Sequence, residues 1–286
     1  MKTPLHYLLA FLFIVTTGVG FAQTEDDEYD YWDDYEFELW DDDNRPQASL
    51  SFGFTNASLH NAVQDFSPLS IAEIRLGFQE FEEEWEGIWE LEANSFGLAS
   101  ISNEMGKKQR SGEIGAKMWR ISMNREKGYG YCLGDVKIIP VTGSGLTWTT
   151  SQFNGPVPLL QDRKILNLYS DAFRFGTQVQ AGLQVRVGDY MGVQFGYERN
   201  AVFSRTMFWK WAGSAILEEI GNGLIDQFVK RVFRNAPAAV PVVNVLLKGA
   251  YSFGVYQLRA EKMNYPFDSE PPMMHDSFKF GLVFTL

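Results

Sequence analysis

Histidine, serine and aspartate could build a hydrolase site in this chain, but its histidines are few. Apart from one histidine in the leading apolar segment, the sequence has only His60 and His275. His275-Asp276-Ser277 has the residue types of a Ser-His-Asp site, yet neighbours along a strand point to opposite faces. His60 follows Ser58 in an expected loop. We therefore expect ordinary histidines and no catalytic residues.

Metal and cofactor chemistry also lacks its usual motifs. Cys132 is the single cysteine, so the sequence has no internal disulfide and no His/Cys cluster of the zinc-site type. Gly143-Ser144-Gly145 lacks the lysine and the helix of a phosphate loop, and we expect an ordinary loop there. The sequence predicts no metal and no cofactor.

Polar side chains alternate with apolar ones over residues 173–187. Phenylalanine, valine, leucine, alanine and threonine occupy one face, and glutamine, arginine and glycine occupy the other. At about 3.3 Å per residue, such a run reaches about 50 Å, which is longer than an ordinary soluble strand. An extended chain in lipid satisfies its backbone only in a closed barrel. The run predicts a membrane-spanning strand, and a long strand of a soluble sandwich or lipocalin-like barrel is the alternative.

Polar residues on the inward faces of such strands are the candidate binding residues. The expected lumen residues are Glu73, Arg75, Gln79, Arg174, Gln178, Gln180, Gln184, Arg186, Gln194 and Glu198. They could form an ion-pair network that fills the barrel or the lining of a selective pore. We favour the network, because side chains come close to filling the interior of a narrow barrel.

Residues 1–22 are predicted to form a signal peptide. Lys2 precedes the apolar run Leu8–Val15, and small residues lead to a cleavage site near Ala22. The run is too short for a helical anchor, and no other stretch reaches 18 uninterrupted apolar residues. The sequence therefore predicts an exported protein without a helical membrane span.

Residues 23–46 are expected to form an acidic, disordered arm. Residues 24–46 hold twelve acids against one base, Arg45, and the remainder of the chain is nearly neutral. Such a run repels itself. It is either a solvated tail or a docking segment for a basic protein partner that could also loosely bind divalent cations. Its charge excludes nucleic acid as a partner.

Residues 47–286 are expected to form one barrel domain of ten strands. The candidate strands are residues 48–56, 70–79, 87–98, 113–124, 129–140, 145–152, 173–187, 191–197, 243–258 and 278–286. Facing Val187 with Met191 keeps both apolar faces on one side and requires the three-residue connection Gly188–Tyr190. Closed bacterial barrels have even strand numbers. Eight strands would remain if residues 48–56 and 145–152 were not strands.

Residues 213–235 instead show helical spacing of their apolar residues. Acids lie early and bases late, which suits the helix dipole, and Pro237 ends the segment. With ten strands, this connection would fall on the periplasmic side. We expect an amphipathic helix that caps the barrel mouth, and a plug in the lumen or a helix on the inner leaflet are the alternatives.

The C-terminal residues 278–286 resemble the β-signal of bacterial outer-membrane β-barrel proteins. Its polar, glycine, aromatic and final hydrophobic positions are filled by Lys279, Gly281, Phe284 and Leu286, although that family more often ends in phenylalanine. The resemblance implies the bacterial outer membrane as location. It also implies membrane lipid and the barrel assembly machinery as partners, the latter through these four residues.

The sequence as a whole predicts an all-β, transmembrane antiparallel β-barrel with one helix. We expect a non-enzymatic protein that acts as a scaffold, as a secretion or assembly component, or as a narrow porin-like transporter. One alternative is an outer-membrane enzyme that modifies lipids or envelope polymers. The other is a soluble periplasmic barrel that binds an apolar ligand.

Overall fold

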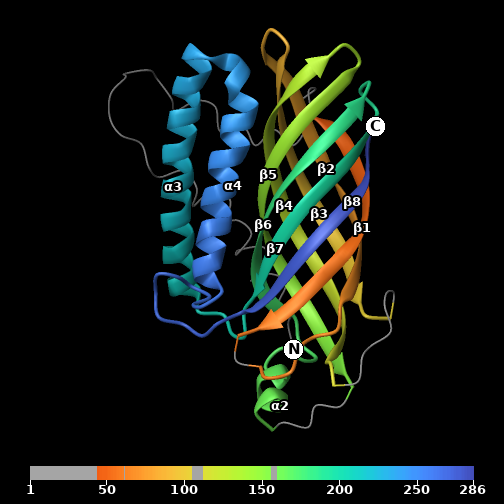
Figure 1. Ribbon diagram of the computed structural model, residues 1–286, viewed down its shortest axis with the longest axis vertical. Coiled ribbons are helices and arrows are strands. Elements are labelled where there is room, and N and C mark those ends of the chain that lie inside the picture. Colours follow the sequence, from red (N-terminus) through yellow and green to blue (C-terminus); the bar gives the residue numbers. More distant parts are fainter. Residues whose placement is uncertain (1–43, 61, 105–111, 156–159) are drawn as a thin grey trace, which may run out of the picture. The chain divides into compact units, whose positions relative to one another are not determined.

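A single closed sheet dominates the computed structural model, which describes residues 44–60, 62–104, 112–155 and 160–286 (Figure 1). Each strand pairs antiparallel with the next, and β1 pairs with β8. The fold is a closed eight-stranded antiparallel β-barrel. Its strands are β1 (Arg45–Leu59), β2 (Leu69–Trp85), β3 (Ile88–Ser102), β4 (Gly115–Leu133), β5 (Val136–Asn154), β6 (Arg174–Val187), β7 (Met191–Val202) and β8 (Met273–Thr285).

The predicted signal peptide and nearly all of the predicted acidic arm lie outside the described residues. The arm's last residues, Arg45 and Pro46, already belong to β1. The barrel therefore begins two residues earlier than the sequence predicts.

Alternation of side chains gives the barrel a polar interior and an apolar exterior. Outward phenylalanines and aliphatic residues stay exposed, among them Phe52, Leu76, Phe96, Ile121 and Phe280. The residues between them along each strand point into the lumen and are buried. This distribution is the reverse of that in a soluble protein, and it confirms the faces that the period-two pattern predicts.

The prediction of ten strands is wrong, and the fallback of eight is correct. Residues 113–124, 129–140 and 145–152 make only two long strands, β4 and β5. The chain does not turn at residues 125–128. It turns at Gly134, where φ is 66°. The fallback assumed that residues 48–56 and 145–152 were not strands. Both segments do lie in strands, β1 and β5, so the number eight arises in another way.

Glycines inside β4 and β5 account for this error, because here they mark close packing and not turns. Gly143 and Gly145 lie in the middle of β5, so the loop predicted there is also wrong. A Cβ on Gly145 would lie 2.8 Å from Oδ1 of Asn124 and 3.3 Å from Cγ of Gln178. The missing side chains leave room for lumen amides.

The two ends of the barrel differ in their connections. Two or three residues link β2 to β3, β4 to β5 and β6 to β7 at the end where β1 begins and β8 stops. We call this the short-turn end, and the opposite end, with longer connections, the loop end. Val187 pairs with Met191 as predicted, and Gly188 begins the turn with φ of 63°. Helix α2 (Leu160–Asn167) lies in the β5–β6 connection at the loop end.

The β7–β8 connection is a helical hairpin. It consists of α3 (Phe208–Asn235), a 3-10 turn at Pro237–Ala239, and α4 (Val240–Arg259). Helix α3 confirms the predicted helix, but residues 243–258 are helical and not a strand. Buried residues of α4 recur at helical spacing, as Asn244, Gly249 and Tyr256 show, whereas a strand would bury every second residue.

The hairpin lies against the outer wall of the barrel. Helix α4 contacts β4, β5, β6 and β7, and Figure 1 shows both helices alongside β5 and β6. The hairpin starts at the loop end, opposite the end where β1 begins and β8 stops. Its tip packs near the short-turn end, where the Phe233 ring lies 6.4 Å from that of Trp85. The expected cap and the alternative plug are therefore both wrong.

Candidate functional site

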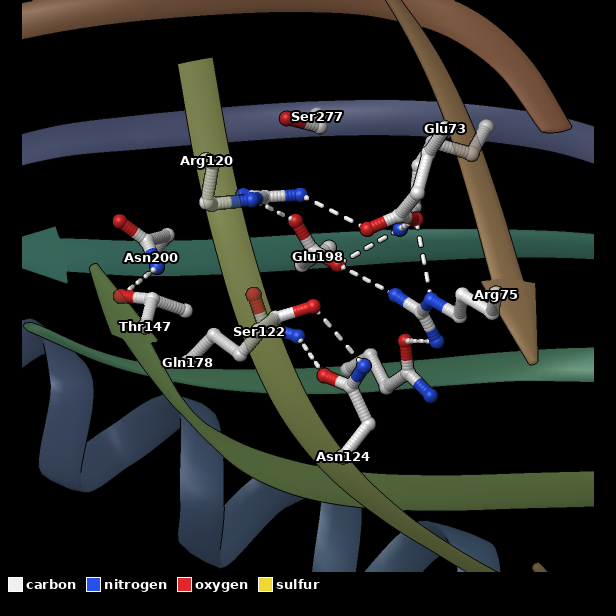
Figure 2. A network of polar contacts seen from close by, with 12 residues as sticks. Glu73, Arg75, Arg120, Ser122, Asn124, Thr147, Gln178, Glu198, Asn200 and Ser277 are labelled. Atoms are coloured by element: carbon white, nitrogen blue, oxygen red, sulfur yellow. Dashed lines mark hydrogen bonds and ion pairs between the residues drawn. The ribbon is translucent and has the colours of Figure 1, made fainter. Parts of the chain in front are cut away.

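Three acids and three bases meet in the lumen and form the central ion-pair network. Figure 2 labels four of them, Glu73, Arg75, Arg120 and Glu198. Glu73 and Glu198 each contact three bases at 2.6–3.3 Å. Arg75 also reaches Oε1 of Glu126 at 2.6 Å. The network's members come from four strands and are Glu73, Arg75, Arg120, Glu126, Glu198 and Lys279.

The central network is buried and electrically balanced. Its side chains range from fully buried for Glu73 and Arg120 to 9% exposed for Lys279. Buried charges persist only when they are paired and hydrogen-bonded. Beside the network, the described residues leave a cavity of about 30 Å³, lined by Arg75, Gln180 and Gln194 among others. That volume holds about one or two water molecules, so side chains fill the lumen here.

Apolar side chains close the lumen on both sides of the network. At the loop end, a cluster that includes Leu69, Ile101 and Met118 is covered by Leu166 of α2 and by Tyr169. At the short-turn end, Leu91, Ile139 and Val141 pack with Phe81. Each cluster is built from inward residues of several strands. The central network therefore lies between two apolar clusters of the lumen.

Further polar side chains lie beside the short-turn cluster. Nη2 of Arg186 donates to Oε1 of Gln79 at 2.6 Å and to Thr285 at 3.2 Å. Lys137 lies 4.4 Å from the ring of Phe81 and 2.9 Å from Asp189 in the β6–β7 turn. The hydrogen bond from Lys137 lowers the pKa of the Asp189 carboxyl.

Most residues that the sequence places in the lumen are hydrogen-bonded there. Glu73, Arg75 and Glu198 belong to the central network, and Gln79 and Arg186 bond to each other. The other glutamines have separate positions. Gln180 accepts from Arg75 at 3.1 Å, Gln184 donates to Glu126 at 3.3 Å, Gln178 donates to Asn124, and Gln194 lines the small cavity.

Arg174 differs from the other predicted lumen residues. It begins β6 at the loop end, is half-buried, and stands in register with Thr149. The structure does not bring it to the central network.

Sequence reasoning missed half of the central network. Arg120 alternates with Trp119 and Ile121, so its period-two position was a usable signal. Glu126 was hidden by the predicted turn over residues 125–128. Lys279 was noticed only as a position of the C-terminal signal, although it too alternates with outward phenylalanines.

The two histidines do not form a hydrolase site in the structure. His60 is exposed in the turn after β1. His275 is fully buried in the lumen, and neither ring nitrogen has a hydrogen-bond partner. Asp276 lies on the opposite face, where Arg199 and Tyr197 bind it. Ser277 bonds to Thr55 at 2.9 Å. Among the described residues, no group of three His, Cys, Asp or Glu could hold a metal ion.

A second group of buried polar residues lies outside the lumen, between the hairpin and the wall. Arg259 of α4 is 2% exposed and pairs with Glu218 of α3 at 2.8 Å. It also donates to Thr177 of β6 and Ser214 of α3. Beside it is a cleft of about 220 Å³, lined by Ser144, Glu219 and other residues of α3, α4 and β4–β6. The outward row of β6 is thus covered here by protein.

Comparisons with known proteins return similar architecture only. No protein-family model matches the chain, and no curated protein matches it. Neisserial surface protein A (NspA) is 10% identical with a TM-score of 0.40, over 84% of this chain and 97% of that one. Ail, the attachment invasion locus protein of Yersinia pestis, is 9% identical with a TM-score of 0.32, over 85% and 99%. TM-scores below 0.5 support no inference about function.

Proposed function

We propose that this protein is a closed, non-enzymatic β-barrel of the bacterial outer membrane that acts as a scaffold. The observation that carries the proposal is the inside-out distribution of its side chains. Much of the exposed wall is apolar, apart from a charged patch on β2–β4 that includes Glu92 and Arg125, whereas the balanced network of Glu73, Arg75, Arg120, Glu126, Glu198 and Lys279 is buried inside. Lipid is the solvent in which both faces are satisfied. The C-terminal resemblance supports the same location.

The filled lumen favours a scaffold over a transporter. A pore needs a continuous polar path, whereas this lumen has a small cavity between two apolar clusters. The network then has a structural role, because it joins strands on different sides of the barrel. The acidic arm is the part that such a scaffold would present to protein partners.

Fractionation with gel migration tests the membrane proposal. We expect the protein in the outer-membrane fraction, released only by detergent, with faster migration before heating than after. Recovery from the periplasm without detergent would refute the proposed location and favour the soluble barrel.

Conductance in planar bilayers tests the closed lumen. Purified barrel is expected to give no channels, and steady ohmic channels would refute the scaffold role and restore the transporter. The enzyme alternative predicts a hydrolase activity that His275→Ala and His60→Ala abolish. If the protein is non-enzymatic, as we propose, neither substitution should cause a loss of hydrolase activity.

A further inference from the structure

The hairpin has the same inside-out distribution as the barrel. Helix α4 buries Asn244 and Arg259 together with Val240, Pro241, Gly249 and Tyr256, whereas both helices expose large apolar residues. These are Ile216, Leu217, Ile220, Leu224 and Phe228 on α3, and Val242, Leu246, Leu247 and Leu258 on α4. A surface helix of a soluble protein shows the opposite pattern. Water is therefore the wrong solvent for the outer face of this hairpin.

Charged residues in the middle of the hairpin are largely paired between its helices. Glu218 pairs with Arg259 at 2.8 Å, and Asp226 pairs with Lys248 at 2.6 Å. Glu219, beside the cleft, is an exposed acid within this segment. Ionisable groups inside a bilayer typically face protein or a polar cavity and pair with each other. The two ion pairs fit that rule, whereas Glu219 is exposed beside the cleft.

The length of the hairpin and the residues at its ends match a membrane. The segment Pro237–Arg259 is apolar and long enough to cross one, with a mean hydropathy of 1.4. The 20 residues of α4 reach about 30 Å, the thickness of the hydrocarbon core. Trp209, 83% exposed, lies at the base of α3. Lys230, Arg231 and Arg234 near the tip would meet lipid headgroups.

We propose that the hairpin is embedded in the membrane, and that its exposed face contacts the acyl chains of the same bilayer that holds the barrel. It enters from the loop end, follows the wall, and brings its tip to the short-turn end. The proposal rests on the proposed membrane location. Lipid is the occupant because the exposed residues of α3 and α4 continue the apolar exterior of the strands that they flank.

Spin labels in lipid nanodiscs test the proposal. In a Cys132→Ser background, the label is placed by Leu224→Cys on the outer face of α3. Leu76→Cys on the bare barrel wall is the lipid control, and Lys164→Cys on α2 is the aqueous control. Collision rates with oxygen and with a neutral nickel chelate are measured. The Leu224 label should match the Leu76 label, with nickel collisions at least about tenfold below those at Lys164, because hydrocarbon excludes polar solutes.

Each other outcome overturns a defined part of the reasoning. An aqueous profile at Leu224 with a lipid profile at Leu76 refutes the membrane-embedded hairpin and leaves the barrel in the membrane. Aqueous profiles at both sites refute the membrane location itself. Dipolar broadening between Leu224 labels shows that a second copy covers the face and refutes lipid as its occupant. Ile220→Cys repeats the test if the first variant does not fold.

Discussion

Removing Arg75 from the lumen should destabilise the barrel far more than removing an arginine from its surface. The Arg75 guanidinium lies 2.6 Å from Glu126 and 3.0 Å from both Glu73 and Glu198. Arg75→Met keeps much of the side-chain volume but leaves these buried carboxylates short of one positive charge. Breaking a buried ion pair from one side costs about 3–5 kcal/mol. We expect a loss of that size in the free energy of unfolding.

Urea unfolding in lipid vesicles, followed by tryptophan fluorescence, provides the measurement. Arg125→Met is the matched control, because Arg125 is 62% exposed and pairs with the partly exposed Glu92 at 3.3 Å. An exposed pair of this kind contributes at most about 1 kcal/mol. Adding Glu126→Gln to Arg75→Met removes the carboxylate that loses its partner when Arg75 is replaced. The double variant should therefore recover about 1–3 kcal/mol of coupling energy.

The result that would refute this reasoning is equal destabilisation by Arg75→Met and Arg125→Met. Equal effects would mean that water screens the lumen charges as it screens the surface. A hydrated lumen is what a pore requires, so that result would also argue against the scaffold role.

Two further predictions concern the hairpin and barrel assembly. Gly221→Ala should loosen the hairpin, since a Cβ there would lie 2.0 Å from the Tyr251 hydroxyl. Gly223→Ala, which meets nothing within 4 Å, should stabilise α3 by up to about 1 kcal/mol, and limited proteolysis of the hairpin would show the contrast. Phe284→Ala should lower the amount of heat-modifiable barrel in cells, whereas Phe280→Ala, outside the signal positions, should not. Equal yields would contradict a role for the C-terminal resemblance in assembly.

Local periodicity was a reliable guide to faces and an unreliable guide to strand ends. The run at residues 173–187 predicted correctly which side chains of β6 point inward. Turn prediction failed at residues 125–128, where Glu126 points into the lumen, Gly128 packs against β5, and Arg125 and Lys127 pair with Glu92 on the outer face. A β-strand that crosses a barrel tolerates such residues because its inward face is polar.

Helix α4 shows a second limit of sequence reasoning. Its apolar composition and β-branched residues suggested a strand, and its buried polar residues have meaning only when the barrel wall stands beside them. Arg259 illustrates this, because its partners Glu218 and Thr177 are far away in sequence. The sequence pattern of α4 alone does not predict these partners of Arg259.

The sequence by itself determined which faces of the strands are polar and which are apolar in the barrel, because alternation along a strand is a local property. It also placed eight polar lumen residues that the structure finds hydrogen-bonded. Only the tertiary structure decided the strand number, the partners within the central network, and the place of the hairpin outside the wall. Those features depend on contacts between residues far apart in the chain, and their energies come from burial that appears only when the barrel closes.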